Sequence, residues 1–136
     1  MSEGLQPRLE RWWSTPPADL GPEARSDFEE LLSALEGGGV RAAEPAAEGW
    51  RVNEWVKRGI LLGFRLGRLV ELPAAGPLRF FDKDTVFPRE LSVRDGVRVV
   101  PGGTAVRRGA YLGPGVVLMP PAYVNVGAFV GEGTMV

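Results

Sequence analysis

The chain has 136 residues, with 16 lysines and arginines against 17 aspartates and glutamates, and a formal net charge of -1. This balance argues against a dedicated binder of nucleic acid or of anionic membranes. Cysteine and histidine are both absent. The chain therefore cannot itself supply a disulfide, a cysteine nucleophile, a three-histidine zinc site or a Ser-His-Asp triad. Its chemistry must rely on carboxylates, arginine, lysine, tyrosine or backbone amides, and we expect no metal.

Hydropathy and the first residues indicate the compartment. The uncharged residues 109–130 are rich in glycine and proline and break every few residues, so they do not form a membrane-spanning helix. The first ten residues lack a basic segment followed by an apolar core, which argues against a secretory signal. We therefore expect a cytoplasmic protein without a membrane span.

Residues 1–97 predict a mainly helical domain with linker segments. An amphipathic or frayed tail is expected around Leu5, Leu9, Trp12 and Trp13, and residues 14–17 end any helix there. A second helix starts at Pro22, carries Glu23 in its first turn and stops at the glycines 37–39. Its apolar side chains recur at helical spacing: Phe28, Leu31, Leu32 and Leu35.

The rest of this domain combines short strands, one more helix and a proline-rich turn. A short strand is expected around residues 40–43, and a third helix over residues 53–63 with Asn53 as its N-cap and Gly63 or Gly67 as its stop. Residues 65–72 have a strand-like pattern, and residues 73–77 indicate a turn or linker. Four apolar side chains are then expected to anchor the following loop on the helical domain: Phe80, Phe81, Val86 and Phe87.

From residue 98 onward the sequence repeats every six residues. An unbroken series of aliphatic residues marks this period: Val100, Val106, Leu112, Leu118, Val124, Val130 and Val136. Two positions before each of the last six stands a small or β-branched residue: Thr104, Ala110, Val116, Ala122, Ala128 and Thr134. Glycine forms a third column at 103, 109, 115, 127 and 133, interrupted only by Pro121. This hexapeptide pattern predicts a parallel β-helix.

Each hexapeptide of such a fold forms one side of a triangular prism, so that three of them complete a coil. The aliphatic residue points inward, the small residue fits near the corner and glycine permits the tight turn. Ordinary hairpins would instead alternate with a period of two. The predicted fold class is α+β, with a helical domain over residues 1–97 and about two coils of a parallel β-helix over residues 98–136. The residues expected to share the prism core are Val100, Val106, Leu112, Leu118, Val124 and Val130.

Several blocks along residues 40–136 resemble one protein family. In the repeat they are Arg98-Val99-Val100-Pro101, Val117-Leu118-Met119-Pro120 and Tyr123-Val124-Asn125-Val126, and earlier ones are Trp55-Val56-Lys57 and Phe80-Phe81-Asp82-Lys83. The family is 2,3,4,5-tetrahydropyridine-2,6-dicarboxylate N-succinyltransferase, an enzyme of bacterial lysine and diaminopimelate synthesis. Two departures stand out: Pro121, where the family has serine, and Gly102-Gly103, in place of a proline-containing stretch.

The resemblance implies a left-handed β-helix that assembles as a homotrimer, with sites between neighbouring β-helices. It implies transfer of a succinyl group from succinyl-CoA to the amine of ring-opened tetrahydrodipicolinate, with a carboxylate as general base and backbone amides around the oxyanion. Family members are about twice as long, and the family's active-site aspartate would follow Val136. The resemblance therefore implies an N-terminal portion that contains no catalytic residue and is inactive alone.

Both substrates are anionic, so their site needs a guanidinium that can bind a carboxylate bidentately. Arg98 matches the family arginine assigned to substrate binding and is expected to be exposed beside the first coil. Arg107 is a weaker candidate, because solvated outward positions for Arg107 and Arg108 are the simpler interpretation. Asp82 and Lys83 are expected to form a local ion pair of little energetic value. For Asn125 we favour a structural role. We assign Glu132 no catalytic role.

Two classes of function remain open. The first is the N-terminal portion of the succinyltransferase, with tetrahydrodipicolinate and succinyl-CoA as partners and no covalently bound cofactor. The second is a catalytically inactive binding or assembly module built on a β-helix stub. Other hexapeptide acyltransferases and γ-class carbonic anhydrases are disfavoured because they commonly depend on histidine, which is absent. These residues leave the choice between a succinyl and an acetyl donor open.

Overall fold

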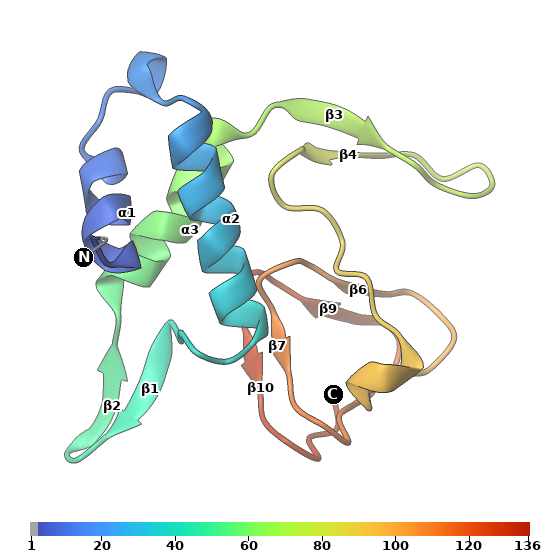
Figure 1. The fold of residues 1–136 in the computed structure, drawn as a ribbon. Coiled ribbons are helices and arrows are strands. Elements are labelled where there is room, and N and C mark those ends of the chain that lie inside the picture. Colours follow the sequence, from blue (N-terminus) through green and yellow to red (C-terminus); the bar gives the residue numbers. More distant parts are fainter. Residues whose placement is uncertain (1–2) are drawn as a thin grey trace.

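In the computed structural model, which describes residues 3–136, three α-helices pack around one apolar core (Figure 1). They are α1 (Leu5–Trp13), α2 (Pro22–Glu36) and α3 (Glu54–Leu66), and a short 3₁₀ turn, η1 (Pro17–Asp19), lies between the first two. The second helix, predicted from Pro22 to the glycines at 37–39, is confirmed, and the amphipathic start of the chain forms α1. None of the helices in this range has the length and apolar character needed to cross a membrane. The core contains Leu9, Phe28, Leu31, Leu32, Leu35, Val56, Leu62 and Val86.

Helix α3 ends at the second of its two predicted stops. It continues to Leu66, with Gly67 as its C-cap, so Gly63 lies inside the helix and is not its stop. A Cβ atom at Gly63 would lie 2.1 Å from Cζ of the fully buried Phe28, which shows that this glycine serves close packing. The strand-like pattern predicted from residue 65 is correspondingly wrong at its start, because the strand begins only at Leu69.

Two antiparallel hairpins flank α3. Strands β1 (Ala43–Ala46) and β2 (Gly49–Val52) form the first, and β3 (Leu69–Leu72) and β4 (Phe80–Lys83) form the second. The prediction that Phe80 and Phe81 anchor the following loop is wrong, because they are 51% and 61% exposed. Their hairpin projects away from the helices in Figure 1. Val86 is the member of the expected set that is buried.

The hexapeptide region, residues 98–136, forms three parallel strand pairs. Strand β5 (Arg98–Val99) pairs with β8 (Val117–Leu118), β6 (Thr104–Val106) with β9 (Ala122–Val124), and β7 (Tyr111–Leu112) with β10 (Phe129–Val130). In the last two pairs the partners are eighteen residues apart, as Thr104 opposite Ala122 shows. This is the spacing that three hexapeptides per coil predict.

A second apolar core lies inside this region. Val106, Leu112, Leu118 and Val124 are buried in it, and Val130 is partly buried against it. Members of the small-residue column, Ala110 and Val116, are also completely buried. Residues two apart, such as Ala110 and Leu112, therefore both point inward, as the pleat of an extended chain requires.

Val100 does not belong to the inward column. In the β5–β8 pair, Arg98 lies opposite Val117 and Val99 opposite Leu118, so these partners are nineteen residues apart. In the other two parallel pairs the partners are eighteen residues apart. One extra residue is therefore accommodated between Val99 and Thr104. Gly102, at φ 146, supplies a backbone conformation there that other residues rarely adopt. The prediction that Val100 stacks in the prism core is wrong for this reason.

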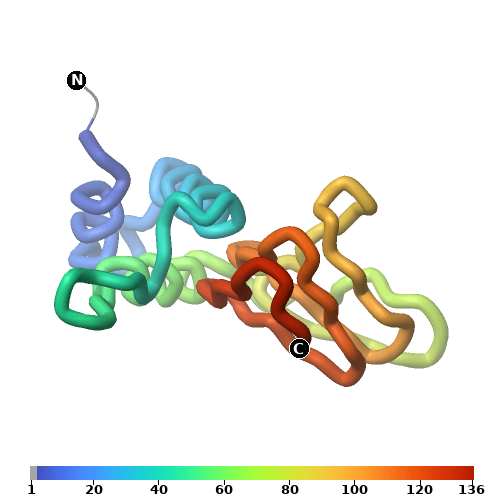
Figure 2. The backbone as a smooth tube through the Cα atoms, turned by 90° about the horizontal axis from the view of Figure 1, so that it is seen from below, coloured from blue at the N-terminus to red at the C-terminus, as the bar shows by residue number. Residues whose placement is uncertain are grey.

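The helical and hexapeptide parts lie side by side and pack directly on each other (Figure 2). Val126 of the hexapeptide region is buried within the helical core. Gly109 has φ +81, and a Cβ there would lie 2.8 Å from Leu32 Cδ2. Gly38 approaches the ring of Tyr111 just as closely, at 2.9 Å for a Cβ atom. Glycines therefore allow the two parts to meet without a gap.

Candidate functional site

Arg98 lies on the first strand of the hexapeptide region, with an exposed side chain. Its neighbour across the sheet is Val117, and Val117 in turn bridges to Met135, so that the three residues share one column. The Arg98 backbone N–H donates to the Val116 carbonyl at 2.9 Å. Among residues 3–136 its guanidinium has no hydrogen-bond or ion-pair partner. The group is therefore available to bind an anion.

A capped turn leads into Arg98. The 3₁₀ turn η2 (Val93–Asp95) begins after Ser92, whose backbone N–H donates to Asp95 Oδ2 at 2.7 Å, while Gly96 ends it in the left-handed conformation. The hydrogen bond from the Ser92 amide lowers the pKa of the Asp95 carboxyl below its ordinary value. Gly115 N–H donates to the Gly96 carbonyl at 2.8 Å. This hydrogen bond joins the end of the turn to the coil two residues before Arg98.

Arg107 lies at a junction and not on a solvated face. Its guanidinium forms an ion pair with Asp82 of β4, and its side chain is only 19% exposed. The guanidinium carbon is 5.8 Å from the centre of the Phe64 ring and 5.9 Å from that of Tyr123. The expected local pair of Asp82 with Lys83 is wrong, because Asp82 pairs with Arg107 across 25 positions and the Lys83 ammonium donates to a backbone carbonyl.

A cavity of about 540 Å³ opens between the β3–β4 hairpin and strand β6. Arg107 and Asp82 lie in its wall together with the apolar side chains of Phe80, Phe81 and Tyr123. An anion could bind Arg107 there only in competition with the Asp82 carboxylate. The charge of Arg107 is therefore already compensated, and Arg98 is the better anion site of the two.

Arg108 connects the hexapeptide region to α2. Its Nε donates to Glu36 at 3.0 Å, and a second ion pair joins it to Glu29. Burial opposes its charge, but the hydrogen bonds that Arg108 donates to Glu36 and Glu29 outweigh this effect and raise the pKa of Arg108. The backbone N–H of Gly109 also donates to Glu36, at 2.8 Å. The prediction of a solvated Arg108 is wrong, since this group holds two parts of the fold together.

The other polar groups of the repeat show no catalytic arrangement. Asn125 Oδ1 accepts from the Val126 backbone N–H at 2.9 Å and from the Tyr123 hydroxyl at 3.2 Å, which is a local turn contact. Glu132 is exposed. Within residues 3–136, no group of three or more acidic side chains is placed to hold a metal ion.

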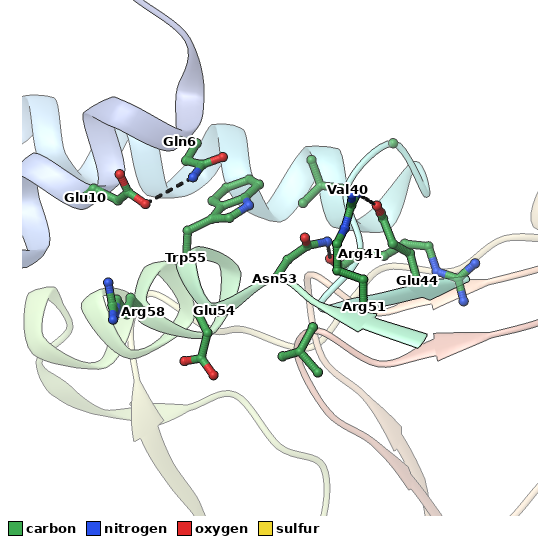
Figure 3. Close-up of a pocket in the computed structure, with 12 residues that line it drawn as sticks. Gln6, Glu10, Val40, Arg41, Glu44, Arg51, Asn53, Glu54, Trp55 and Arg58 are labelled. Atoms are coloured by element: carbon green, nitrogen blue, oxygen red, sulfur yellow. Dashed lines mark hydrogen bonds and ion pairs between the residues drawn. The ribbon is translucent and has the colours of Figure 1, made fainter. Parts of the chain in front are cut away.

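A second cavity, of about 530 Å³, had no signal in the sequence pattern (Figure 3). It lies between α1, the start of α3 and the β1–β2 hairpin, so its walls come from three distant segments of the chain. Asn53 is at the N-cap position of α3, as predicted, but its side chain makes no capping hydrogen bond, and its Nδ2 donates to the Arg41 carbonyl at 2.8 Å. The charged side chains in the wall are balanced in sign: Arg41, Arg51 and Arg58 against Glu10, Glu44 and Glu54. This balance gives the cavity no preference for either charge.

Comparison with known proteins identifies the relatives of the chain. Residues 5–66 match the family model described as tetrahydrodipicolinate N-succinyltransferase N-terminal. A 2,3,4,5-tetrahydropyridine-2,6-dicarboxylate N-succinyltransferase of Polynucleobacter asymbioticus is 42% identical over 146 aligned residues, which cover 100% of this chain and 52% of that relative. The protein of the same name from Acinetobacter baylyi is 45% identical over 123 residues, covering 88% of this chain and 44% of the relative.

A third relative of this name, from Methylorubrum extorquens, is 43% identical over 118 residues, 82% of this chain and 41% of its own length. The chain thus spans about half the length of the curated relatives it matches. The match of residues 5–66 and the similarity that continues through the hexapeptide region agree with the resemblance of the sequence blocks. The chain belongs to the tetrahydrodipicolinate N-succinyltransferase family, of which it carries an N-terminal portion.

Proposed function

We propose that this chain is the N-terminal part of an enzyme that transfers a succinyl group from succinyl-CoA to the amine of ring-opened tetrahydrodipicolinate. The observation that carries the proposal is the exposed, unpaired guanidinium of Arg98 on the first hexapeptide strand of a chain related to such transferases. A planar guanidinium can donate to both oxygens of a carboxylate at once. Arg98 is accordingly proposed to bind one carboxylate of the dicarboxylate substrate.

The reaction needs more groups than this chain supplies. The substrate amine attacks the thioester carbonyl after a base removes its proton, and the tetrahedral oxyanion then expels the CoA thiolate. Glu132 is exposed and has no carboxylate or guanidinium partner within the described range, and we assign it no part in this step. The general base is proposed to come from the region of the relatives that this chain does not span. Arg98 contributes binding and orientation.

The fold proposed for the active enzyme is a left-handed parallel β-helix assembled as a homotrimer. The parallel pairing at eighteen-residue spacing and the stacked apolar core support a prism-like coil. Flat sides of such a coil are suited to association in a closed cyclic oligomer. Sedimentation of the full-length protein as a strict monomer at micromolar concentration would contradict the trimer.

The test is a kinetic comparison in the full-length protein that carries this chain. Release of CoA from succinyl-CoA is measured with tetrahydrodipicolinate as acceptor, for the parent, R98K and R94K. Lysine cannot reproduce a bidentate contact, so R98K should raise the KM for the dicarboxylate by about 10-fold, the equivalent of one charge-assisted hydrogen bond. Arg94 is exposed in the preceding turn, and R94K should leave the KM unchanged.

Three other results would count against the proposal. An unchanged KM in R98K would refute the role of Arg98. Transfer of an acetyl group in preference to a succinyl group would refute the donor. Binding of the dicarboxylate by the full-length protein without any acyl transfer would favour the alternative of an inactive binding or assembly module.

A further inference from the structure

Arg89 attaches the segment before η2 to the hexapeptide coil. Its backbone N–H donates to the Val106 carbonyl at 2.7 Å, and its Nη1 donates to the Ala110 carbonyl at 2.7 Å. The side chain is only 15% exposed. Because both its backbone and its guanidinium bind carbonyls of the first coil, Arg89 has a fixed position relative to that coil.

Asp95 extends this connection to the start of β5. Its Oδ1 lies 3.4 Å from Arg89 Nη2, while its Oδ2 accepts the Ser92 N–H at 2.7 Å. Gly96 follows immediately, and Arg98 is only three residues beyond Asp95. A path of polar contacts therefore runs from the Ala110 carbonyl through Arg89 to Asp95, three residues before the strand begins.

Strand β5 itself makes few contacts, although Gly96 and Val97 before it are attached to the coil. It contains two residues and pairs with β8 alone. The Arg98 N–H donates to the Val116 carbonyl at 2.9 Å. The Val100 N–H, just beyond the end of the strand, donates to the Leu118 carbonyl at 3.0 Å. Val99, in the inward column, is still 43% exposed. A short strand at the end of a stack, with few buried contacts, opens locally more easily than its neighbours.

The direction of the Arg98 guanidinium depends on this strand. No side chain within residues 3–136 binds it, so its backbone position alone sets where it can reach. Bidentate recognition of a carboxylate is sensitive to displacements of an ångström or less. From this arrangement we infer that Arg89 and Asp95 are positioning residues, which hold Arg98 where it can bind the dicarboxylate. The inference rests on the proposed function of Arg98.

The experiment compares R89Q, D95N and R94Q with the parent in the full-length protein. R94Q is the matched control, because it removes the same charge as R89Q from an exposed position in the same segment. R89Q and D95N should raise the KM for tetrahydrodipicolinate by about 10-fold, as for loss of one charge-assisted contact. The KM for succinyl-CoA and kcat should stay within about twofold of the parent. R89K, which retains one of the two side-chain contacts, should recover part of the loss.

Amide hydrogen exchange supplies a readout that does not depend on turnover. In R89Q and D95N, the N–H groups of Arg98 and Val100 should exchange faster, whereas those of Tyr111 and Gly113, bonded to β10 and its flanks, should keep the parent's rates. A general loss of protection would instead mean that the substitutions only destabilise the coil, and would overturn the inference.

A double variant separates this inference from the proposed function. If both are right, R89Q/R98K has the same KM as R98K, because Arg98 no longer offers a contact for Arg89 to position. If R98K raises the KM and R89Q does not, only the positioning role fails. If R98K leaves the KM unchanged, the proposed role of Arg98 fails and the positioning role fails with it.

Discussion

Gly63 is the position at which a single methyl group tests the packing of the helical core. It lies inside α3, opposite the completely buried ring of Phe28. A Cβ atom at this position would lie 2.1, 2.2 and 2.7 Å from three ring carbons of Phe28. The ring is enclosed by the rest of the core, so it cannot move away without displacing other side chains.

Two opposing effects decide the stability of Gly63→Ala. Alanine is favoured over glycine in a helix by about 1 kcal/mol. Inserting a methyl group into a filled core costs about 1–3 kcal/mol, and the three short contacts place this site near the upper value. We therefore expect G63A to lower the free energy of unfolding by about 2 kcal/mol.

Urea unfolding followed by far-UV circular dichroism measures this loss. G103A is the control, because a Cβ at Gly103 meets nothing within 4 Å, and its stability should stay within about 0.5 kcal/mol of the parent. In F28L/G63A the smaller side chain makes room for the methyl group, so the combined loss should be less than the sum of the single losses by about 1 kcal/mol. A G63A protein as stable as the parent would refute the packing of Phe28 against α3.

Three further predictions concern the hexapeptide region and acid stability. Leu118→Asp places an unpaired charge in a fully buried position and should abolish the cooperative unfolding transition of the coil, whereas Met119→Asp, at a position 45% exposed, should not. Glu36→Ala removes the acceptor of two N–H donors of the hexapeptide region and should cost about 1–3 kcal/mol in urea unfolding. Hydrogen bonds from the backbone amides of neighbouring segments lower the folded-state pKa of Asp84 and Asp95. Their contribution is complete above the unfolded pKa of about 3.9 and is lost as the pH falls through the folded values, so that D84N/D95N should show a weaker decline of the thermal midpoint below about pH 4 than the parent.

Local patterns in the sequence were sufficient for the elements whose geometry depends on neighbouring residues. The start of α2 at Pro22 and its end before Gly37 follow from capping preferences, and the structure has both. The six-residue period likewise predicted the eighteen-residue spacing of the parallel pairs, because each strand of a coil repeats the same inward alternation. The resemblance that identified the family also depends on such local blocks, and it singled out Arg98.

Other features depend on residues that are far apart in the chain. Arg107 and Arg108 look like solvated charges in sequence, yet their partners lie 25 to 79 positions away. The extra residue that shifts Val99 into the inward column is visible only in the register with β8, since Val100 fits the six-residue period equally well. Gly63 resembles a helix stop until Phe28 is seen against it. In each case the partner comes from another element, and only the tertiary structure determines which charges are neutralised, which register is adopted and where a methyl group has room.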